Sequence, residues 1–402
     1  MQVAVIGGGA AGFFSALSAK AHHPRAQVTI YEKTDKLLSK VKVSGGGRCN
    51  VTHSCFKISE LVKFYPRGEK PLKKAFGVFS PTDTISWFQE RGVELKTEAD
   101  GRMFPTTDSS QTIIDCLMKE CHSMGIGIKT KSNIKSLVPT KEGFVLTFKN
   151  GETKTVQKVI VATGGSPRPE GFNWLRDLGH SIEEPVPSLF TFNMPEEPIK
   201  ELMGVVVNPA TVRVMGTRLK NTGPLLITHW GMSGPAILKL SSFGARVLND
   251  LEYRFKVLVN WTGDRSEQDI REVLAVTVYQ HPKKKVFNVN PFGLPGRIWD
   301  FLLKKIEVSE TMIWDNIGKK NLNRLVHILM NDEYSIEGKT TFKEEFVTCG
   351  GVSLQDIDIK TMQSKQVPNL YFAGEVLDID GVTGGFNFQA AWTTGFIAGK
   401  LE

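Results

Sequence analysis

The sequence has no long apolar run, and this shortage excludes one class of protein at once. No apolar stretch in its 402 residues approaches the roughly 20 residues that a membrane-spanning helix needs. The first residues lead directly into an apolar strand, without the charged region and cleavage site of a signal peptide. We therefore expect a cytoplasmic protein that has no membrane segment.

Cysteine is also scarce, and positive charge is not concentrated. The five cysteines are an odd number without a CxxC pair, which indicates neither a disulfide framework nor a metal site. The net charge is +8, but the basic residues are scattered and their longest run is Lys283–Lys285. A scattered distribution favours a solvated basic surface over a nucleic-acid interface. Nucleic acid is therefore the less favoured partner, and a small-molecule substrate the more favoured one.

The strongest motif stands at the beginning of the chain. An apolar strand over residues 3–6 runs into Gly7-x-Gly9-x-x-Gly12, and a helix of small residues follows. In a dinucleotide-binding turn the first glycine allows the tight turn, the second lets the backbone approach a pyrophosphate, and the third lets helix and strand pack closely. The helix N-terminus would direct its free N–H groups at that pyrophosphate.

An acidic residue follows the next strand at the appropriate distance. The strand over residues 27–31 ends at Glu32, twenty residues after Gly12. An acid at this position binds a ribose 2′-hydroxyl and disfavours a 2′-phosphate. The pattern predicts a dinucleotide-binding unit, but it does not distinguish FAD from NAD.

A second glycine-rich loop, Ser44-Gly-Gly-Gly-Arg-Cys-Asn50, has many free N–H donors. Arginine, cysteine and asparagine are not typical of a flexible linker, so we interpret this segment as a ligand-binding loop. Cys49 is either a reactive thiol beside the ligand or a small buried packing residue, and the second is the commoner case.

Two later strands also end in glycine-rich segments, at Ala162–Gly165 and at Phe372–Glu375. All three strand ends would have to meet on one sheet, a layout that suits a long cofactor such as FAD. An NAD-dependent dehydrogenase, which keeps its nucleotide in one contiguous half, is the alternative. Asp378 and Asp380 follow the last strand as either acid–base groups or turn residues.

The middle of the chain has a different pattern. Residues 185–259 predict a β-rich segment, in which His229 lies in a loop beside Trp230 and is either a substrate-facing or a structural histidine. Residues 264–333 predict a helical insert. No second GxGxxG motif is present, so a separate nicotinamide-binding domain is not indicated.

With these motifs the chain resembles the bacterial FAD-dependent flavoprotein family that includes aminoacetone oxidase and the bile-acid-pathway NAD(P)/FAD-dependent oxidoreductases. The resemblance covers nearly the whole chain, and its most specific parts are the Ser44–Asn50 loop and the block from Ala373 to Ala391. One departure is the short segment Ser166–Phe172, where the family has a longer run.

The resemblance implies an α/β fold: a three-layer ββα, Rossmann-like FAD-binding domain with an inserted β-barrel domain that carries a small helical subdomain. The implied boundaries are 1–188 and 345–402 for FAD binding, 189–263 and 334–344 for the barrel, and 264–333 for the helices. The implied cofactor contacts are Gly7, Gly9, Ala10, Ala11, Gly12, Glu32, Lys33, Lys40, Ser44, Gly46, Gly47, Arg48, Cys49, Asn50, Ile134, Ala162, Thr163, Gly164, Gly374, Glu375, Gly384, Gly385, Phe386 and Asn387.

The implied reaction is hydride transfer between a small organic substrate and FAD, with NAD(P)H or oxygen as the redox partner. Arg48, Arg102, His229 and Glu375 are the candidate catalytic residues near the flavin. Either arginine would fix an anionic group of the substrate, and His229 would move protons. An RNA-modifying flavoprotein is a further alternative, motivated by the charge of +8.

Overall fold

The computed structural model describes residues 1–340 and 347–402, and these form two compact units. Unit 1 contains Met1–Ser188 together with the described C-terminal residues up to Glu402. Unit 2 contains residues 189–340. The chain therefore leaves unit 1 once, builds unit 2 and returns.

Unit 1 is built on a seven-stranded sheet of order β20-β21-β22-β10-β1-β2-β6. Five neighbouring strands run parallel, and their apolar residues are buried, as expected for strands covered on both faces. The strands are β1 (Gln2–Ile6), β2 (Gln27–Tyr31), β6 (Gly127–Lys129), β10 (Lys158–Val161), β20 (Ile357–Asp358), β21 (Gln363–Ser364) and β22 (Leu370–Phe372).

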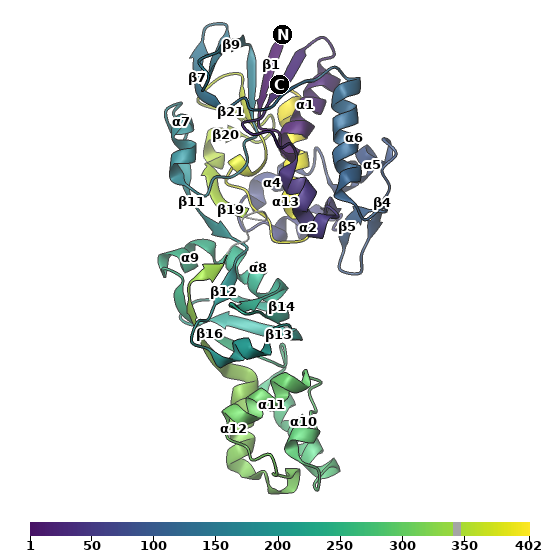
Figure 1. The fold of residues 1–402 in the computed structure, drawn as a ribbon, viewed down its shortest axis with the longest axis vertical. Coiled ribbons are helices and arrows are strands. Elements are labelled where there is room, and N and C mark those ends of the chain that lie inside the picture. Colours follow the sequence, from purple (N-terminus) through teal and green to yellow (C-terminus); the bar gives the residue numbers. More distant parts are fainter. Residues whose placement is uncertain (341–346) are drawn as a thin grey trace. The chain divides into compact units, whose positions relative to one another are not determined.

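Helices and a small antiparallel sheet complete the three layers of unit 1 (Figure 1). Helices α1 (Ala10–His22) and α13 (Phe386–Gly399) pack against each other. Their close approach needs glycine, because a Cβ on Gly399 would lie 2.5 Å from the Ser15 carbonyl oxygen. The antiparallel layer is β7 (Ile134–Thr140), β8 (Gly143–Phe148) and β9 (Thr153–Val156), and the rings of Phe148 and Tyr31 join it to the parallel sheet. The predicted ββα fold is confirmed.

Shorter elements surround the sheet of unit 1. Residues 94–104, whose sequence alternates around Asp100-Gly101 as in a hairpin, form β4 and the start of β5, which join β3 in a second antiparallel sheet. These elements are α2 (Ser39–Gly47), β3 (Thr52–His53), α3 (Ile58–Leu61), α4 (Glu69–Ala75), α5 (Pro81–Gln89), β4 (Leu95–Thr97), β5 (Arg102–Pro105), α6 (Ser110–Ser123), α7 (Asn173–Arg176), β11 (Ile182–Ser188) and β19 (Val347–Val352).

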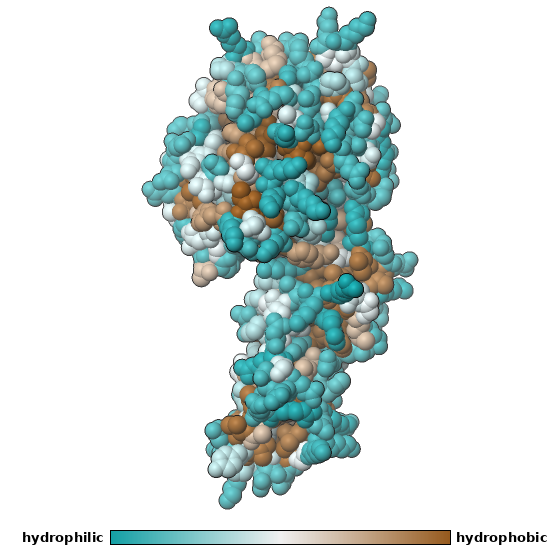
Figure 2. All heavy atoms as spheres, turned by 180° about the vertical axis from the view of Figure 1, so that it is seen from behind, coloured by the Kyte–Doolittle hydropathy of each residue, from teal (hydrophilic) through white to brown (hydrophobic). Residues whose placement is uncertain are grey.

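The surface of unit 1 alternates between polar and apolar areas. In the view from behind, hydrophobic side chains gather near the middle of unit 1, while the surface around them is mainly hydrophilic (Figure 2). Among the described residues, no helix is long and apolar enough to span a membrane.

Unit 2 contains a seven-stranded antiparallel sheet of order β17-β16-β13-β14-β15-β12-β18. The two outermost strands, β17 and β18, are separated in sequence only by Gly338, so the sheet has to curl round on itself. The strands are β12 (Thr191–Asn193), β13 (Val206–Val214), β14 (Lys220–Ile227), β15 (Gly231–Ser233), β16 (Arg254–Asn260), β17 (Asp332–Glu337) and β18 (Lys339–Thr340).

Unit 2 also has helices, and one pair was not predicted. The region expected to be β-rich contains α8 (Pro235–Phe243) and α9 (Ala245–Asp250). Residues Ala236, Ile237 and Leu240 are buried at helical spacing, and this burial outweighs the turn signal of Gly234–Pro235. The predicted helical insert corresponds to α10 (Glu267–Gln280), α11 (Gly296–Lys305) and α12 (Gly318–Asn331).

Candidate active site

The carboxyl ends of four parallel strands lie in one row. Ile6 is in register with Val161 on one side and with Tyr31 on the other, and Val161 is in register with Phe372. Ligands of open α/β sheets bind outside this edge. The structure thus brings together three glycine-rich segments that are far apart in sequence, and the residues that follow the four strands are Gly7, Glu32, Ala162 and Ala373.

The glycines of the first motif have different steric roles. A Cβ on Gly12 would lie 1.9 Å from the Gly7 carbonyl oxygen, and Gly7 itself has a φ of +118°. A Cβ on Gly9, in contrast, would meet no protein atom within 4 Å. Gly7 and Gly12 are therefore required by the protein itself, whereas Gly9 borders open space.

The open space beside Gly9 fits the pyrophosphate of a dinucleotide. Gly46, Gly47 and Gly164 likewise would place a Cβ in open space. Gly9 is also the N-cap of α1, and no side chain among the described residues caps that helix, so its first N–H groups and positive dipole end are available to an anion. The residues present fit the cofactor that the sequence predicts.

Glu32 lies against the glycine turn. Its Oε2 accepts a hydrogen bond from the Gly8 amide at 2.8 Å, and its Oε1 accepts from the amide and the hydroxyl of Thr34, each at 2.9 Å. Lys33 is exposed, and Ile134 is half-buried at the start of β7. These contacts hold the Glu32 carboxylate beside the motif, where we propose that it binds the ribose.

The second glycine loop contacts the C-terminal loop. Helix α2 loses helical geometry from Ser44 to Gly46 and becomes an irregular turn. With its amide oriented to suit its neighbours, Asn50 accepts a hydrogen bond from the Gly385 amide at 3.0 Å and donates to the Thr52 carbonyl at 3.0 Å. Gly385, which has a φ of +90°, immediately precedes α13. The two predicted flavin-side segments are thus joined.

Cys49 is fully buried. Burial raises the pKa of its thiol to about 12, although a hydrogen bond with Ser44 opposes the shift. A thiol with this pKa is protonated at neutral pH and is a poor nucleophile. The structure therefore favours the packing interpretation of Cys49.

Glu375 links three segments at the sheet edge. Its Oε2 is 2.6 Å from Lys40 Nζ, and its Oε1 accepts a hydrogen bond from the Thr348 amide at 2.9 Å. A Cβ on Gly165 would lie 2.9 Å from the same Oε1. Among the described residues, the buried Thr348 Oγ1 has no hydrogen-bond partner. Glu375 therefore fixes the Lys40 ammonium group and contacts both β19 and the segment that follows β10.

Phe386 and Asn387, two of the predicted cofactor contacts, have side chains engaged in the protein itself. Phe386 is buried and stacks on Phe64 and His53, with ring centroids 4.4 and 4.7 Å apart. Asn387 exchanges two hydrogen bonds of 2.8 Å with the backbone of Gly381. Their side chains hold the C-terminal loop in shape, so only their backbone N–H groups, in the first turn of α13, are available to a ligand.

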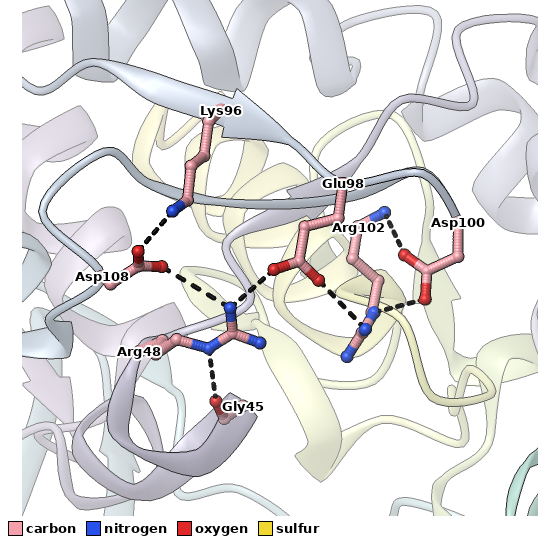
Figure 3. Close-up of polar contacts among 7 residues, drawn as sticks. All are labelled: Gly45, Arg48, Lys96, Glu98, Asp100, Arg102 and Asp108. Carbon is pink, nitrogen blue, oxygen red and sulfur yellow. Dashed lines mark hydrogen bonds and ion pairs between the residues drawn. The ribbon is translucent and has the colours of Figure 1, made fainter.

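Arg48 and Arg102 are joined through Glu98 (Figure 3). Glu98 Oε1 is 2.6 Å from Arg48 Nη1, and Oε2 is 3.0 Å from Arg102 Nη2. Both guanidinium groups lie over the ring of Phe104, at 3.9 and 5.5 Å from its centroid. Asp108 makes a further ion pair with Arg48 at 3.5 Å.

The remaining contacts show how this network orients Arg48. Arg48 Nε donates to the Gly45 carbonyl at 3.4 Å, and the hydrogen bond from Nη1 to Glu98 is the main cause that raises the pKa of Arg48. Among the described residues, no hydrogen bond or ion pair involves its Nη2. Arg102, whose Nε is 2.7 Å from Asp100 Oδ2, is held from both sides. Arg48 Nη2 is therefore available to a ligand, and so is Arg102 Nη1, which likewise has no hydrogen bond or ion pair among the described residues.

His229 lies in unit 2, unlike the other candidate residues. It is exposed, and its ring lies on that of Trp230 with centroids 4.3 Å apart.

Sequence reasoning missed two groups in unit 1. Glu98 was overlooked because an acid in a hairpin carries no motif, and Arg67 because its partner Asp380 is distant in sequence. Across the described residues, no cluster of three His, Cys, Asp or Glu side chains suits a metal ion.

The fold and the glycine-lined sheet edge define a Rossmann-like dinucleotide-binding protein. A family model described as "HI0933-like protein Rossmann domain" matches residues 1–401. The chain belongs to this family and is an FAD-dependent oxidoreductase.

Three known proteins are similar to the chain over nearly its whole length. It is 29% identical to a ribosomal RNA dihydrouridine synthase of Escherichia coli, over 97% of this chain and 95% of that protein. It is 25% identical to a 3-dehydro-bile acid delta(4,6)-reductase of Clostridium scindens, over 99% and 98%. The fold resembles that of a 3-ketosteroid delta1-dehydrogenase from Sterolibacterium denitrificans, with a TM-score of 0.52, 11% identity and coverage of 99% and 98%.

Proposed function

We propose that this protein reduces a carbon–carbon double bond that is conjugated to a carbonyl group, and that its substrate is uridine in RNA. The observation that carries the reaction type is Arg48, a fixed cation in the Ser44–Asn50 loop whose Nη2 has no hydrogen bond among the described residues. The same loop contacts the C-terminal segment through Asn50 and Gly385. FAD, once reduced by NADH or NADPH, would supply the hydride.

The role of Arg48 follows from charge. When a hydride adds to the carbon β to a carbonyl, negative charge develops on the carbonyl oxygen. A preorganised N–H donor aimed at that oxygen stabilises the transition state, and its value lies in being fixed before the reaction. The contacts of Arg48 with Glu98, Asp108 and Gly45 provide this fixation. A proton is then needed at the neighbouring α-carbon.

The choice of uridine rests on the similar proteins and on charge. Of the two relatives described above, one is named as a ribosomal RNA dihydrouridine synthase and the other as a 3-dehydro-bile acid delta(4,6)-reductase. Forming dihydrouridine from uridine reduces a carbon–carbon double bond. The relative that acts on RNA has the higher identity, and a net charge of +8 suits a polyanion. Sequence patterning alone favoured a small molecule, so a 3-oxo steroid is the second candidate, supported by the bile-acid reductase.

The direct test uses in vitro transcribed ribosomal RNA, the FAD-loaded protein and NADPH or NADH. After nuclease digestion, mass spectrometry should detect dihydrouridine, heavier than uridine by two hydrogen atoms. A parallel reaction with a 3-oxo-Δ4 steroid tests the second candidate. If the nicotinamide bleaches the flavin and only the steroid is consumed, the RNA assignment is wrong and the reaction type stands.

Replacing Arg48 with lysine should lower kcat by about 10²–10³-fold while FAD content is unchanged. Lysine keeps the charge but cannot contact Glu98, the Gly45 carbonyl and a substrate oxygen together. Arg102→Lys is the matched control: Arg102 also pairs with Glu98, but it begins β5 rather than lying in the Ser44–Asn50 loop, so we expect a loss of only about tenfold. Equal losses in the two variants would refute the assigned role of Arg48.

Glu98→Gln tests positioning rather than contact with the substrate. Glutamine retains one oxygen but removes the charge that holds both arginines. We expect kcat to fall by about tenfold, with little change in KM, since the guanidinium remains present but less well oriented. A variant with wild-type kcat would show that Glu98 is dispensable.

A further inference from the structure

A basic cavity of about 640 Å³ lies in unit 1 where β2 and β6 meet the β8–β9 hairpin. The rings of Tyr31 and Phe148 line it, both largely buried, with centroids 5.2 Å apart. Four lysines and one acid, Glu152, are the charged residues that line it, so the lining has a net charge of +3. The lysines are Lys129, Lys131, Lys149 and Lys154.

These lysines are available to a ligand. All four are exposed, and within the described part of the chain none of their ammonium groups forms an ion pair. Backbone hydrogen bonds of 2.8 Å fix the segments that carry two of them, from the Lys131 amide to the Thr34 carbonyl and from the Lys149 amide to the Asn133 carbonyl. The backbone is therefore ordered while the charges are unpaired.

The cavity begins at the same edge of the sheet as the predicted cofactor site. Tyr31 is in register with Lys129, and the residue after Tyr31 is Glu32. Unpaired cations in an ordered, concave setting attract a polyanion, because each lysine–phosphate contact releases condensed counterions. Asn133 and Asn150, which also line the cavity, add neutral hydrogen-bonding groups.

We propose that this basic cavity binds backbone phosphate groups of the RNA substrate. The inference rests on the proposed function. It assigns to the four lysines the sequence-independent part of RNA binding, separate from the chemistry at Arg48. Phosphate contacts position an RNA without reading its bases, so these lysines contribute affinity and not the choice of uridine.

The test compares RNA affinity across a range of salt concentrations for two charge-matched variants. One is Lys129→Gln, Lys131→Gln, Lys149→Gln and Lys154→Gln together. The control removes four exposed lysines of α4 and α6 that make no ion pair among the described residues: Lys70→Gln, Lys73→Gln, Lys74→Gln and Lys119→Gln. The probe is a fluorescently labelled ribosomal RNA transcript, and FAD absorbance is recorded for each protein.

In the cavity variant the slope of log affinity against log salt concentration should decrease in magnitude by about three, because four contacts that contribute about 0.7 each are lost. In the control variant the slope should change little. An unchanged slope overturns the inference, as does an equal change in the control. Loss of FAD overturns it too, because the cavity would then serve the adenine. If the wild-type protein does not bind RNA, the proposed substrate is wrong. If dihydrouridine forms but the slope of the cavity variant is unchanged, only the proposed role of the cavity is wrong.

Discussion

Replacing Gly9 with alanine is expected to give a folded protein that binds FAD more weakly and is purified with less of it. The backbone of Gly9 has φ −94° and ψ −172°, which alanine adopts without strain, and its Cβ would meet no protein atom within 4 Å. The methyl group instead occupies the space where the backbone approaches the pyrophosphate. We expect FAD affinity to fall at least about tenfold, or about 1.4 kcal/mol.

Gly12→Ala is the matched control, because it adds the same methyl group where the protein has no room. Its Cβ would lie 1.9 Å from the Gly7 carbonyl oxygen, so α1 and β1 would have to separate. We expect overpacking to cost about 1–3 kcal/mol or more of unfolding free energy. Thermal unfolding and the flavin absorbance of the purified proteins measure both effects. A Gly9→Ala protein with full flavin content would contradict this assignment of the motif.

The second large effect is expected at a buried ion pair between Arg67 and Asp380. Arg67 contacts both carboxylate oxygens of Asp380, and the Ser188 hydroxyl donates to Asp380 Oδ2 at 2.7 Å. Asp380 is fully buried and the Arg67 side chain is only 13% exposed. Arg67→Met removes the counter-charge and leaves the carboxylate in the interior, which typically costs about 3–5 kcal/mol.

The double variant Arg67→Met/Asp380→Asn distinguishes a lost charge partner from lost packing. It removes the buried charge together with its partner, so it should recover a large part of the stability lost in Arg67→Met. Chemical denaturation of the three proteins at pH 7 provides the measurement. No recovery in the double variant would mean that the arginine side chain acts through its packing.

The same pair gives a pH dependence with a definite sign. Burial raises the pKa of Asp380 from 3.8 to about 6, and the attraction of Arg67 only partly opposes the shift. The folded state therefore binds the proton more tightly than the unfolded state does. The corresponding stability is fully present below about pH 4 and is lost as the pH rises to about 6. In the wild type this contribution to the free energy of unfolding should fall by on the order of 3 kcal/mol between these two pH values. The Asp380→Asn variant should not show this fall.

Local sequence patterns were sufficient wherever a physical requirement lies within a few residues. The turn at Gly7 and Gly12 needs glycine for steric reasons that the motif itself encodes, and the β4–β5 hairpin follows from alternation around a turn. The parallel strands were recognisable as short apolar runs. Their order was not predicted, because pairing between β1, β10 and β22 depends on contacts across most of the chain.

The helices α8 and α9 show where local signals mislead. Glycine and proline next to short apolar runs indicate turns and strands, yet burial of Ile237 and Leu240 against the sheet of unit 2 selects a helix. In such cases the free energy that stabilises the helix comes from packing against other elements, and a local sequence pattern does not reveal that packing.

The sequence by itself determined that the chain binds a dinucleotide, where the glycine loops lie and which residue types surround them. Only the tertiary structure decided which of these residues act on a ligand and which hold one another. Cys49 and Phe386 are directed into the core, and Arg48 and Arg102 are each held by two acids, with Glu98 shared between them. The physical reason is that burial and charge pairing depend on partners such as Glu98, which is fifty residues from Arg48 and has no motif of its own.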